Sequence, residues 1–167
     1  MDWAGIVEQL GDRLLLYARR WAPDEATATD ILQEAFLRVW HANEKQPIPE
    51  ADMSARCYAA VRRAALDHLR SARRRGDREA KGGEWLYEAG SPSFQTDLER
   101  DEERAALERA MSTLPIEQHE VLTLKIWGEL TFAEIAATIE ESPNTVASRY
   151  RLAIAALRKV FAPEEAP

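Results

Sequence analysis

The chain is poor in the residues that build disulfide-bonded, metal-binding and catalytic proteins. Its one cysteine, Cys57, excludes an internal disulfide, and its neighbours indicate a small buried residue on a helix. The three histidines, His41, His68 and His119, are scattered and have no second ligand at metal-site spacing. No glycine-rich loop ends in Lys-Ser or Lys-Thr, so nucleotide hydrolysis has no support. We expect no enzyme activity, no metal, no cofactor and no small-molecule substrate.

Long hydrophobic runs are also missing, and no stretch approaches the length of a membrane span. The N-terminal segment MDWAGIVEQL carries acids where a secretion signal would carry positive charge. No stretch shows the sustained alternation of β-branched residues that marks a strand. Because 46% of the residues are hydrophobic, a packed core is expected nonetheless. These observations predict an all-α, soluble cytoplasmic protein without membrane insertion.

Positive charge is scarce overall, since the formal net charge is −7, but it is concentrated in two segments. Residues 50–75 hold seven arginines against three acids, and residues 143–161 hold four cations and no acid. The residues between them, 76–142, hold sixteen acids against six bases. Because phosphate neutralisation is local, two basic segments predict two separate contacts with nucleic acid.

Helical spacing of apolar residues divides the chain into two parts. The first half predicts three helices: one that ends before Pro23, one with a broad stripe from Ile31 to Trp40, and one from about Ala51 to Arg75. Residues 76–97 contain four of the seven glycines and no sustained stripe, which is typical of a flexible linker. Helical spacing resumes at 98–111 and again at 116–127. We therefore expect two small helical domains.

The segment from Thr131 to Phe161 predicts two helices joined by a very short turn. Thr131 and Glu134 form a capping box, and Ser142 with Pro143 marks a second helix start. The expected buried stripe of the second helix is Val146, Tyr150, Ile154, Leu157 and Phe161. This helix-turn-helix pattern lays its second helix in a DNA major groove.

The third helix of the first half is rich in arginine. The segment RCYAAVRRAALDHLRSARRR has one acid, Asp67, in twenty residues, whereas a solvated helix face usually mixes acids with its bases. This composition favours contact with phosphates over a merely solvated face.

Together these residues resemble a known family. DILQEAFLRVW and RRAALDHLRSARRR resemble region two of bacterial RNA polymerase sigma factors, and LPIEQHEVLTLKIWGELTFAEIAATIEESPNTVASRYRLAIAALRKVF resembles region four. The two modules occur in this order with only a linker between them, which resembles the extracytoplasmic-function type. The implied domains are residues 1–76 for region two, 77–97 for the linker and 98–162 for region four.

The resemblance implies a protein that binds core RNA polymerase and promoter DNA and directs transcription initiation. In the family, the second helix docks on the clamp coiled coil of the largest polymerase subunit; the matching residues here are Asp30, Gln33, Glu34, Arg38 and Trp40. The third helix recognises the minus-ten element; the matching residues are Arg62, Arg63, Asp67, Arg70, Arg73 and Arg74. The last helix reads the minus-thirty-five element; the matching residues are Asn144, Thr145, Ser148, Arg149 and Arg151.

Further expectations follow from the same resemblance. The loop from Gln46 to Met53 is the place to look for a residue that pockets an unstacked base. An anti-sigma protein that clamps both domains is a further partner that the family implies. The chain departs from the family at Ala147, where lysine is common, and at Glu140 and Glu141, where the turn commonly carries glycine. It also has Arg63 where asparagine is common.

Two other classes of protein remain open at the level of sequence. One is a sigma mimic that binds an anti-sigma protein without touching DNA, which the net acidity and Ala147 favour and the two basic segments oppose. The other is an ordinary helix-turn-helix regulator, which would leave DILQEAFLRVW and the arginine-rich helix unexplained.

Overall fold

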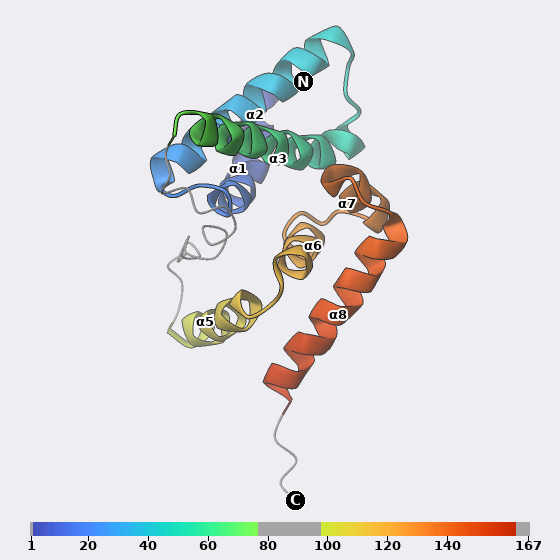
Figure 1. The fold of residues 1–167 in the computed structure, drawn as a ribbon. Helices are drawn as coiled ribbons and strands as arrows, with labels where there is room; N and C mark the ends of the chain where they lie inside the picture. The colour runs from blue at the N-terminus through green and yellow to red at the C-terminus, as the bar shows by residue number, and fades with distance from the viewer. Residues whose placement is uncertain (1, 77–97, 163–167) are drawn as a thin grey trace, which may run out of the picture.

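The computed structural model describes residues 2–76 and 98–162 (Figure 1). Within these ranges every regular element is a helix, which confirms the all-α prediction. The helices are α1 (Trp3–Arg19), α2 (Glu25–Lys45), α3 (Glu50–Arg74), α5 (Leu98–Ser112), α6 (Ile116–Ile126), α7 (Phe132–Ile139) and α8 (Pro143–Phe161). Residues 77–97, which the sequence predicts to be a linker, lie outside the described ranges.

Helices α1, α2 and α3 form a three-helix bundle at the top of Figure 1. Two aspartates start the first two helices: Asp2 accepts a hydrogen bond from the Gly5 amide at 3.0 Å, and Asp24 accepts one from the Thr27 amide at 2.7 Å. Between the helices lies a core in which Tyr17 meets Tyr58 edge to face, with ring centroids 5.3 Å apart. Cys57 is buried in this bundle, as predicted.

Helices α5 to α8 form the second half. Their own small core consists of Ala110, Met111, Leu114, Leu122, Ala153 and Leu157. The predicted buried stripe of α8 is partly wrong, because Phe161 is 50% exposed and Ala153 is buried instead. The reason is geometric: α8 meets α6 and α7 along its N-terminal and central turns, so its last turn projects past them (Figure 1).

The two halves pack against each other, an arrangement that the sequence left open. The largest buried cluster runs through both of them and joins Leu14 and Val61 of the first half to Leu124 and Ile135 of the second. In Figure 1, α7 lies below one end of α3, and these two helices are in contact. Burial of such side chains contributes about 1.5–3 kcal/mol each, so this shared core stabilises a closed arrangement.

Candidate polymerase and nucleic-acid interfaces

The outer face of α2 gathers most of the residues predicted to bind polymerase. Ile31, Ala35 and Val39 turn into the bundle, which leaves the residues between them toward solvent. Asp30, Gln33, Glu34 and Trp40 are exposed, and Arg38 is half-buried. At 100° per residue, Arg38 and Trp40 lie about 160° apart around the helix, so they mark opposite edges of this face.

A chain of four alternating charges joins α2 to α3. Arg38 contacts Glu34 at 2.9 Å and Asp67 at 3.0 Å, and Asp67 contacts Arg70 at 3.5 Å. The hydrogen bond that Arg38 donates to Glu34, followed by the one that it donates to Asp67, raises the pKa of Arg38 above its usual value. Single surface ion pairs contribute little stability. Their effect here is to orient the side chains, and they connect the predicted polymerase-binding residues with the predicted minus-ten residues in one network.

A hollow of about 300 Å³ lies beside this chain of charges. Its walls include Asp30 and Glu34 from α2, and His68, Ser71 and the C-cap residue Arg75 from α3 and its end. The hollow is open to solvent, and its lining carries charges of both signs at the junction of the two helices.

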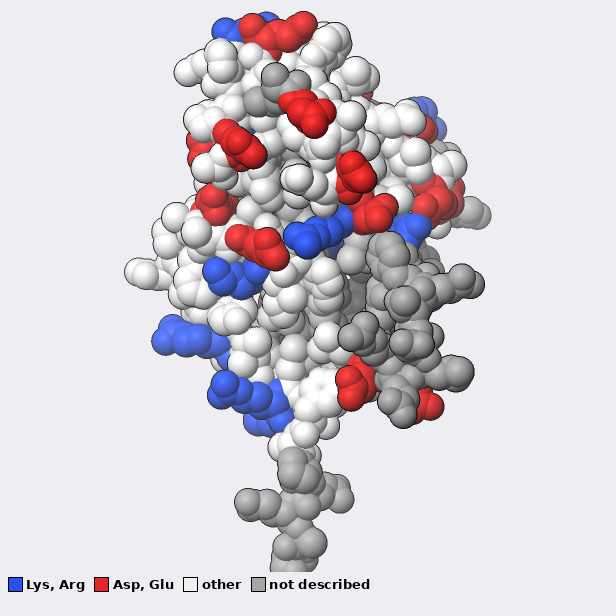
Figure 2. All heavy atoms as spheres, turned by 180° about the vertical axis from the view of Figure 1, so that it is seen from behind, with Lys and Arg blue, Asp and Glu red and all other residues white. Residues whose placement is uncertain are grey.

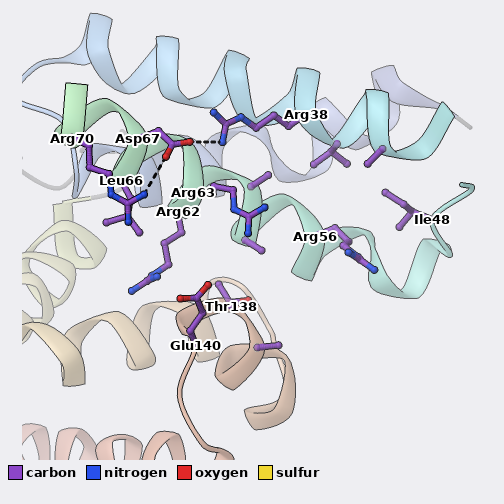
Figure 3. A pocket seen from close by; sticks show the side chains of 15 residues that line it. Arg38, Ile48, Arg56, Arg62, Arg63, Leu66, Asp67, Arg70, Thr138 and Glu140 are labelled. Carbon is purple, nitrogen blue, oxygen red and sulfur yellow. Dashed lines mark hydrogen bonds and ion pairs between the residues drawn. The ribbon is translucent and has the colours of Figure 1, made fainter. Parts of the chain in front are cut away.

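A larger cavity, of about 450 Å³, lies under the arginine-rich face of α3 (Figure 3). Its walls on α2, α3 and the loop between them carry five arginines, one acid and six apolar residues. The arginines are Arg38, Arg56, Arg62, Arg63 and Arg70, the acid is Asp67, and the apolar residues are Val39, Ala42, Ile48, Ala59, Ala60 and Leu66. The opposite wall belongs to α7 and its end, through Ala137, Thr138 and Glu140. The cavity therefore combines cations with apolar surface, as a site for single-stranded nucleic acid does.

The loop between α2 and α3 is held in place at this cavity. The side chain of Asn43 accepts a hydrogen bond from the Ile48 amide at 2.9 Å. Ile48, which lies in the loop predicted to pocket a base, consequently faces the same space as Arg56 and Arg63 (Figure 3).

The helix-turn-helix forms as predicted. The Thr131 hydroxyl accepts a hydrogen bond from the Glu134 amide at 3.2 Å, and the Glu134 carboxylate accepts one from the Thr131 amide at 2.6 Å. Glu140 ends α7 in the left-handed conformation, with φ of 59°. Ser142 then starts α8 by accepting a hydrogen bond from the Thr145 amide at 3.1 Å.

The N-terminal turns of α8 carry the residues predicted to read DNA bases. Asn144 and Arg151 are exposed, whereas Thr145, Ser148 and Arg149 are half-buried. Arg149 contacts Glu141 at 3.0 Å, so it is already engaged within its own motif. Figure 2, seen from behind, shows basic side chains along the lower left, where α8 lies, and acidic ones over the upper half, where α1–α3 lie.

Both halves of the chain match models of known families. The model of sigma-70 region 2 matches residues 6–75, and the model of sigma-70 region 4 matches residues 104–157. The ECF RNA polymerase sigma factor SigL of Mycobacterium tuberculosis is 31% identical over 147 residues, which are 85% of this chain and 78% of that protein. The chain belongs to the extracytoplasmic-function (ECF) sigma factors.

Other relatives agree with this assignment. The RNA polymerase sigma-E factor of Streptomyces coelicolor is 30% identical over 162 residues, which are 95% of this chain and 85% of that protein. The ECF sigma factor SigK of Mycolicibacterium vanbaalenii is 28% identical over 158 residues, which are 94% of this chain and 80% of that protein. This ECF sigma factor therefore directs promoter recognition and transcription initiation. None of its described helices could cross a membrane.

Region 2 of this sigma factor corresponds to α1–α3, and region 4 corresponds to most of α5 together with α6–α8. Of the predicted minus-ten residues, Arg63, Arg70, Arg73 and Arg74 are exposed. Asp67 is half-buried because it bridges two arginines. These five side chains lie on or beside the outer surface of α3.

Arg62 differs from the other predicted minus-ten residues of the sigma factor. Its side chain is 19% exposed and its Nε donates to Glu120 of α6 at 3.2 Å. Its guanidinium also lies over the Trp21 ring, 5.8 Å from the centroid. Region 4 thus occupies the solvent side of this arginine in the described arrangement.

Glu120 is the residue that sequence reasoning missed. It is 6% exposed, and besides Arg62 it accepts a hydrogen bond from the Tyr17 hydroxyl at 2.8 Å. The signal in the sequence was weak: Glu120 stands next to Val121, Leu122 and Leu124, and an acid among apolar residues needs a cationic or hydroxyl partner if it is buried. Which partner it takes depends on the packing of two regions that are distant in sequence.

Proposed function

We propose that the division of labour in this sigma factor follows its two family regions. Residues 1–76 bind polymerase and the minus-ten element, residues 98–162 bind the minus-thirty-five element, and residues 77–97 link them. The cavity under α3, in which five arginines surround an apolar lining, is the observation that carries this proposal.

The polymerase contact is assigned to the exposed face of α2, formed by Asp30, Gln33, Glu34, Arg38 and Trp40. The assigned partner is the clamp coiled coil of the largest polymerase subunit. Two features support this assignment: the acidic and basic groups are pre-oriented by the ion pairs of Arg38, and a large aromatic ring, 41% exposed, lies at the edge of the face. An exposed aromatic beside charged groups is typical of a protein interface.

The minus-ten contact is assigned to α3. Phosphates are neutralised by Arg63, Arg70, Arg73 and Arg74. Arg62 also contacts phosphate when it no longer donates to Glu120. Ile48 and the apolar lining of the cavity accept an unstacked base, because such a surface replaces the stacking that the base loses when the strands separate.

The minus-thirty-five contact is assigned to the N-terminal turns of α8. Asn144 and Arg151 are the primary readers, because both are exposed and because their side chains donate to base edges in the major groove. The half-buried residues Thr145, Ser148 and Arg149 make a smaller contribution to base reading. Thr145 is already hydrogen-bonded to Ser142, and Arg149 is already paired with Glu141.

The remaining assignments follow from these contacts. The protein acts in the cytoplasm, where core polymerase and chromosomal DNA are found, and it catalyses no reaction of its own. An anti-sigma protein is its regulatory partner, and the exposed face of α2 is one surface that such a partner would cover.

Reconstitution with core polymerase tests the proposal. Two variants reverse a charge outside the chain of ion pairs: Asp30→Arg on α2 and Arg63→Glu on α3. The first should lower retention of the sigma factor on immobilised core polymerase at least fivefold. The second should leave retention unchanged and lower initiation from a genomic promoter pool at least tenfold, since it reverses a phosphate contact.

The outcome also separates the alternative functions. Equal loss of core binding in both variants would mean that the assignment of α3 to DNA contact is wrong. Core binding of the unaltered protein without initiation from any promoter would favour a sigma mimic that binds an anti-sigma protein. Absence of core binding would refute the residue assignments on α2.

A further inference from the structure

The cavity under α3 contains two arginines that no neighbouring acid neutralises. Three of its five arginines already form ion pairs; they are Arg38 and Arg70, which contact Asp67, and Arg62, which contacts Glu120. Arg56 and Arg63 are exposed, and no ion pair or hydrogen bond engages their side chains among the residues that the structure describes. Two guanidinium groups are therefore available to an anion in this cavity.

The two available arginines flank a patch of small side chains on α3. Arg56, Ala59, Ala60 and Arg63 stand at positions i, i+3, i+4 and i+7, so they share one face of the helix. Seven residues correspond to a rise of about 10.5 Å, and the two alanines give an apolar floor between the cations. Ile48 borders the same space (Figure 3). A flat aromatic base can lie on this floor while phosphates attached to it reach the arginines.

The wall opposite α3 adds a carboxylate from region 4. Glu140, at the end of α7, points toward Arg62 and Arg63 in Figure 3. Within the described part of the chain, no ion pair or hydrogen bond engages this carboxylate. A carboxylate repels phosphate, but it accepts hydrogen bonds from sugar hydroxyls, as an acidic residue does from the ribose of a bound dinucleotide. This wall therefore favours a ligand that carries hydroxyl donors close to its phosphates.

These features together fit a small ribonucleotide. The cavity has a volume of about 450 Å³, which lies within the range of about 300–1,000 Å³ that is typical of small-molecule sites. Its cations can bind phosphate, its apolar floor can bind a base, and its carboxylate can bind a ribose diol. Because deoxyribose lacks the 2′-hydroxyl, the carboxylate distinguishes a free ribonucleotide from a nucleotide of promoter DNA.

We propose that the cavity between α3 and the end of α7 binds a small phosphorylated ribonucleoside, with its phosphates at Arg56 and Arg63, its base on Ala59 and Ala60, and its ribose hydroxyls at Glu140. The ligand is bound and not converted. Because the two walls belong to regions 2 and 4, the complete site exists only where the regions are in contact, and the ligand stabilises that contact by mass action. This site goes beyond the promoter contacts proposed above, since it places a free small molecule in the cavity that is assigned there to an unstacked base.

Equilibrium dialysis of the full chain against ADP and GDP tests the proposal, with each nucleotide compared with its 2′-deoxy counterpart. At least one of the two ribonucleotides should bind at least fivefold more tightly than its deoxy counterpart, because only ribose offers a diol to Glu140. Absence of binding by both ribonucleotides would overturn the proposal. Equal binding of the ribo and deoxy forms would also overturn it, since the cavity would then suit the nucleotides of DNA.

Arg56→Gln removes one of the two available cations without breaking an ion pair between described residues. It should weaken ribonucleotide binding by about tenfold or more, which is the effect of losing one hydrogen bond to a charged group. Arg73→Gln is the matched control, because Arg73 is an exposed arginine of the same helix that does not line the cavity. The same affinity in the two variants would refute this position of the phosphates and the proposal with it.

Glu140→Gly removes the carboxylate at a residue with φ of 59°, a conformation that glycine adopts without strain. The variant should bind the ribo and deoxy forms equally well. Glu141→Gln is its control and should keep the preference for ribose, because the Glu141 carboxylate pairs with Arg149 within region 4 and does not line the cavity. A preference for ribose that survives in Glu140→Gly would contradict the proposal.

A fluorescent single-stranded DNA of random sequence, measured by anisotropy, reports on the minus-ten assignment separately. If Arg63→Glu weakens DNA binding while neither ribonucleotide binds the unaltered protein, only the ribonucleotide site is refuted. If a ribonucleotide binds as expected while Arg63→Glu binds DNA as well as the unaltered protein does, the minus-ten assignment fails and the ribonucleotide site stands. Helix content by circular dichroism confirms that each variant is folded.

Discussion

Acidification should destabilise the closed fold through one imidazole, that of His119. This side chain lies on α6 against Arg20, the C-cap residue of α1, and the Arg20 guanidinium donates to the His119 Nδ1. Burial, with a smaller contribution from the charge of Arg20, lowers the pKa of His119 to about 3. Protonation would place a second positive charge beside Arg20 and remove the lone pair that accepts this hydrogen bond.

The sign and size follow from proton binding in the two states. An unfolded histidine has a pKa near 6.5, so below that pH the unfolded chain binds a proton that the folded chain does not. Stability therefore falls as the pH drops from about 6.5 toward 3. With these two pKa values, His119 alone lowers the free energy of unfolding by about 2 kcal/mol between pH 7 and pH 5.

Urea denaturation at pH 7 and pH 5, followed by circular dichroism, measures this loss. His119→Gln is the comparison, because the amide can still accept from Arg20 but cannot become charged. All other titrating groups are common to both proteins, so the unaltered protein should lose about 2 kcal/mol more than the variant over this interval. The same pH dependence in both proteins would refute the reasoning.

Three further substitutions test the turns and caps, with the free energy of unfolding from urea titration as the measurement in each case. Glu140→Gly should stabilise region 4 by about 0.5–1 kcal/mol, because Glu140 has φ of 59° and glycine adopts this conformation without strain; a loss of stability would contradict this. Gly128→Ala should destabilise by about 2 kcal/mol or more, since the added Cβ would lie 2.5 Å from the Leu124 carbonyl oxygen; an unchanged value would mean that the turn relaxes freely. Ser142→Ala should cost about 1 kcal/mol through loss of the α8 N-cap, and a neutral result would show that the first turn of α8 does not need this acceptor.

The helix caps could be predicted from the sequence because each depends on interactions between residues that are close together in the chain. The capping box at Thr131 and the N-cap at Ser142 involve atoms three residues apart, so their sequence signals predict the hydrogen bonds that form. Glu140 stands where the turn of the family commonly carries glycine, and in the structure it adopts the left-handed conformation that glycine favours.

The candidate site was only partly predictable. Arginines that point outward from α3, such as Arg63, occupy the surface that helical periodicity assigns to them. The partner of Arg62 was not predictable, because Glu120 is 58 residues away and is brought there by the packing of two regions. Helical periodicity alone predicts that Phe161 is buried, but burial also requires a neighbouring helix that extends to the last turn of α8, and Phe161 is exposed.

Sequence by itself determined the helical class, the two regions and the residue types available to DNA and polymerase, because helix periodicity, caps and local charge act over a few residues. Only the tertiary structure decided which of those residues are exposed to solvent and which are engaged by other parts of the protein. The shared core between Leu14, Val61 and Leu124 brings the regions together, and this packing buries Glu120 against Tyr17. A buried carboxylate is costly unless it is paired. Arg62 supplies the pairing for Glu120, and its side chain is therefore mostly buried.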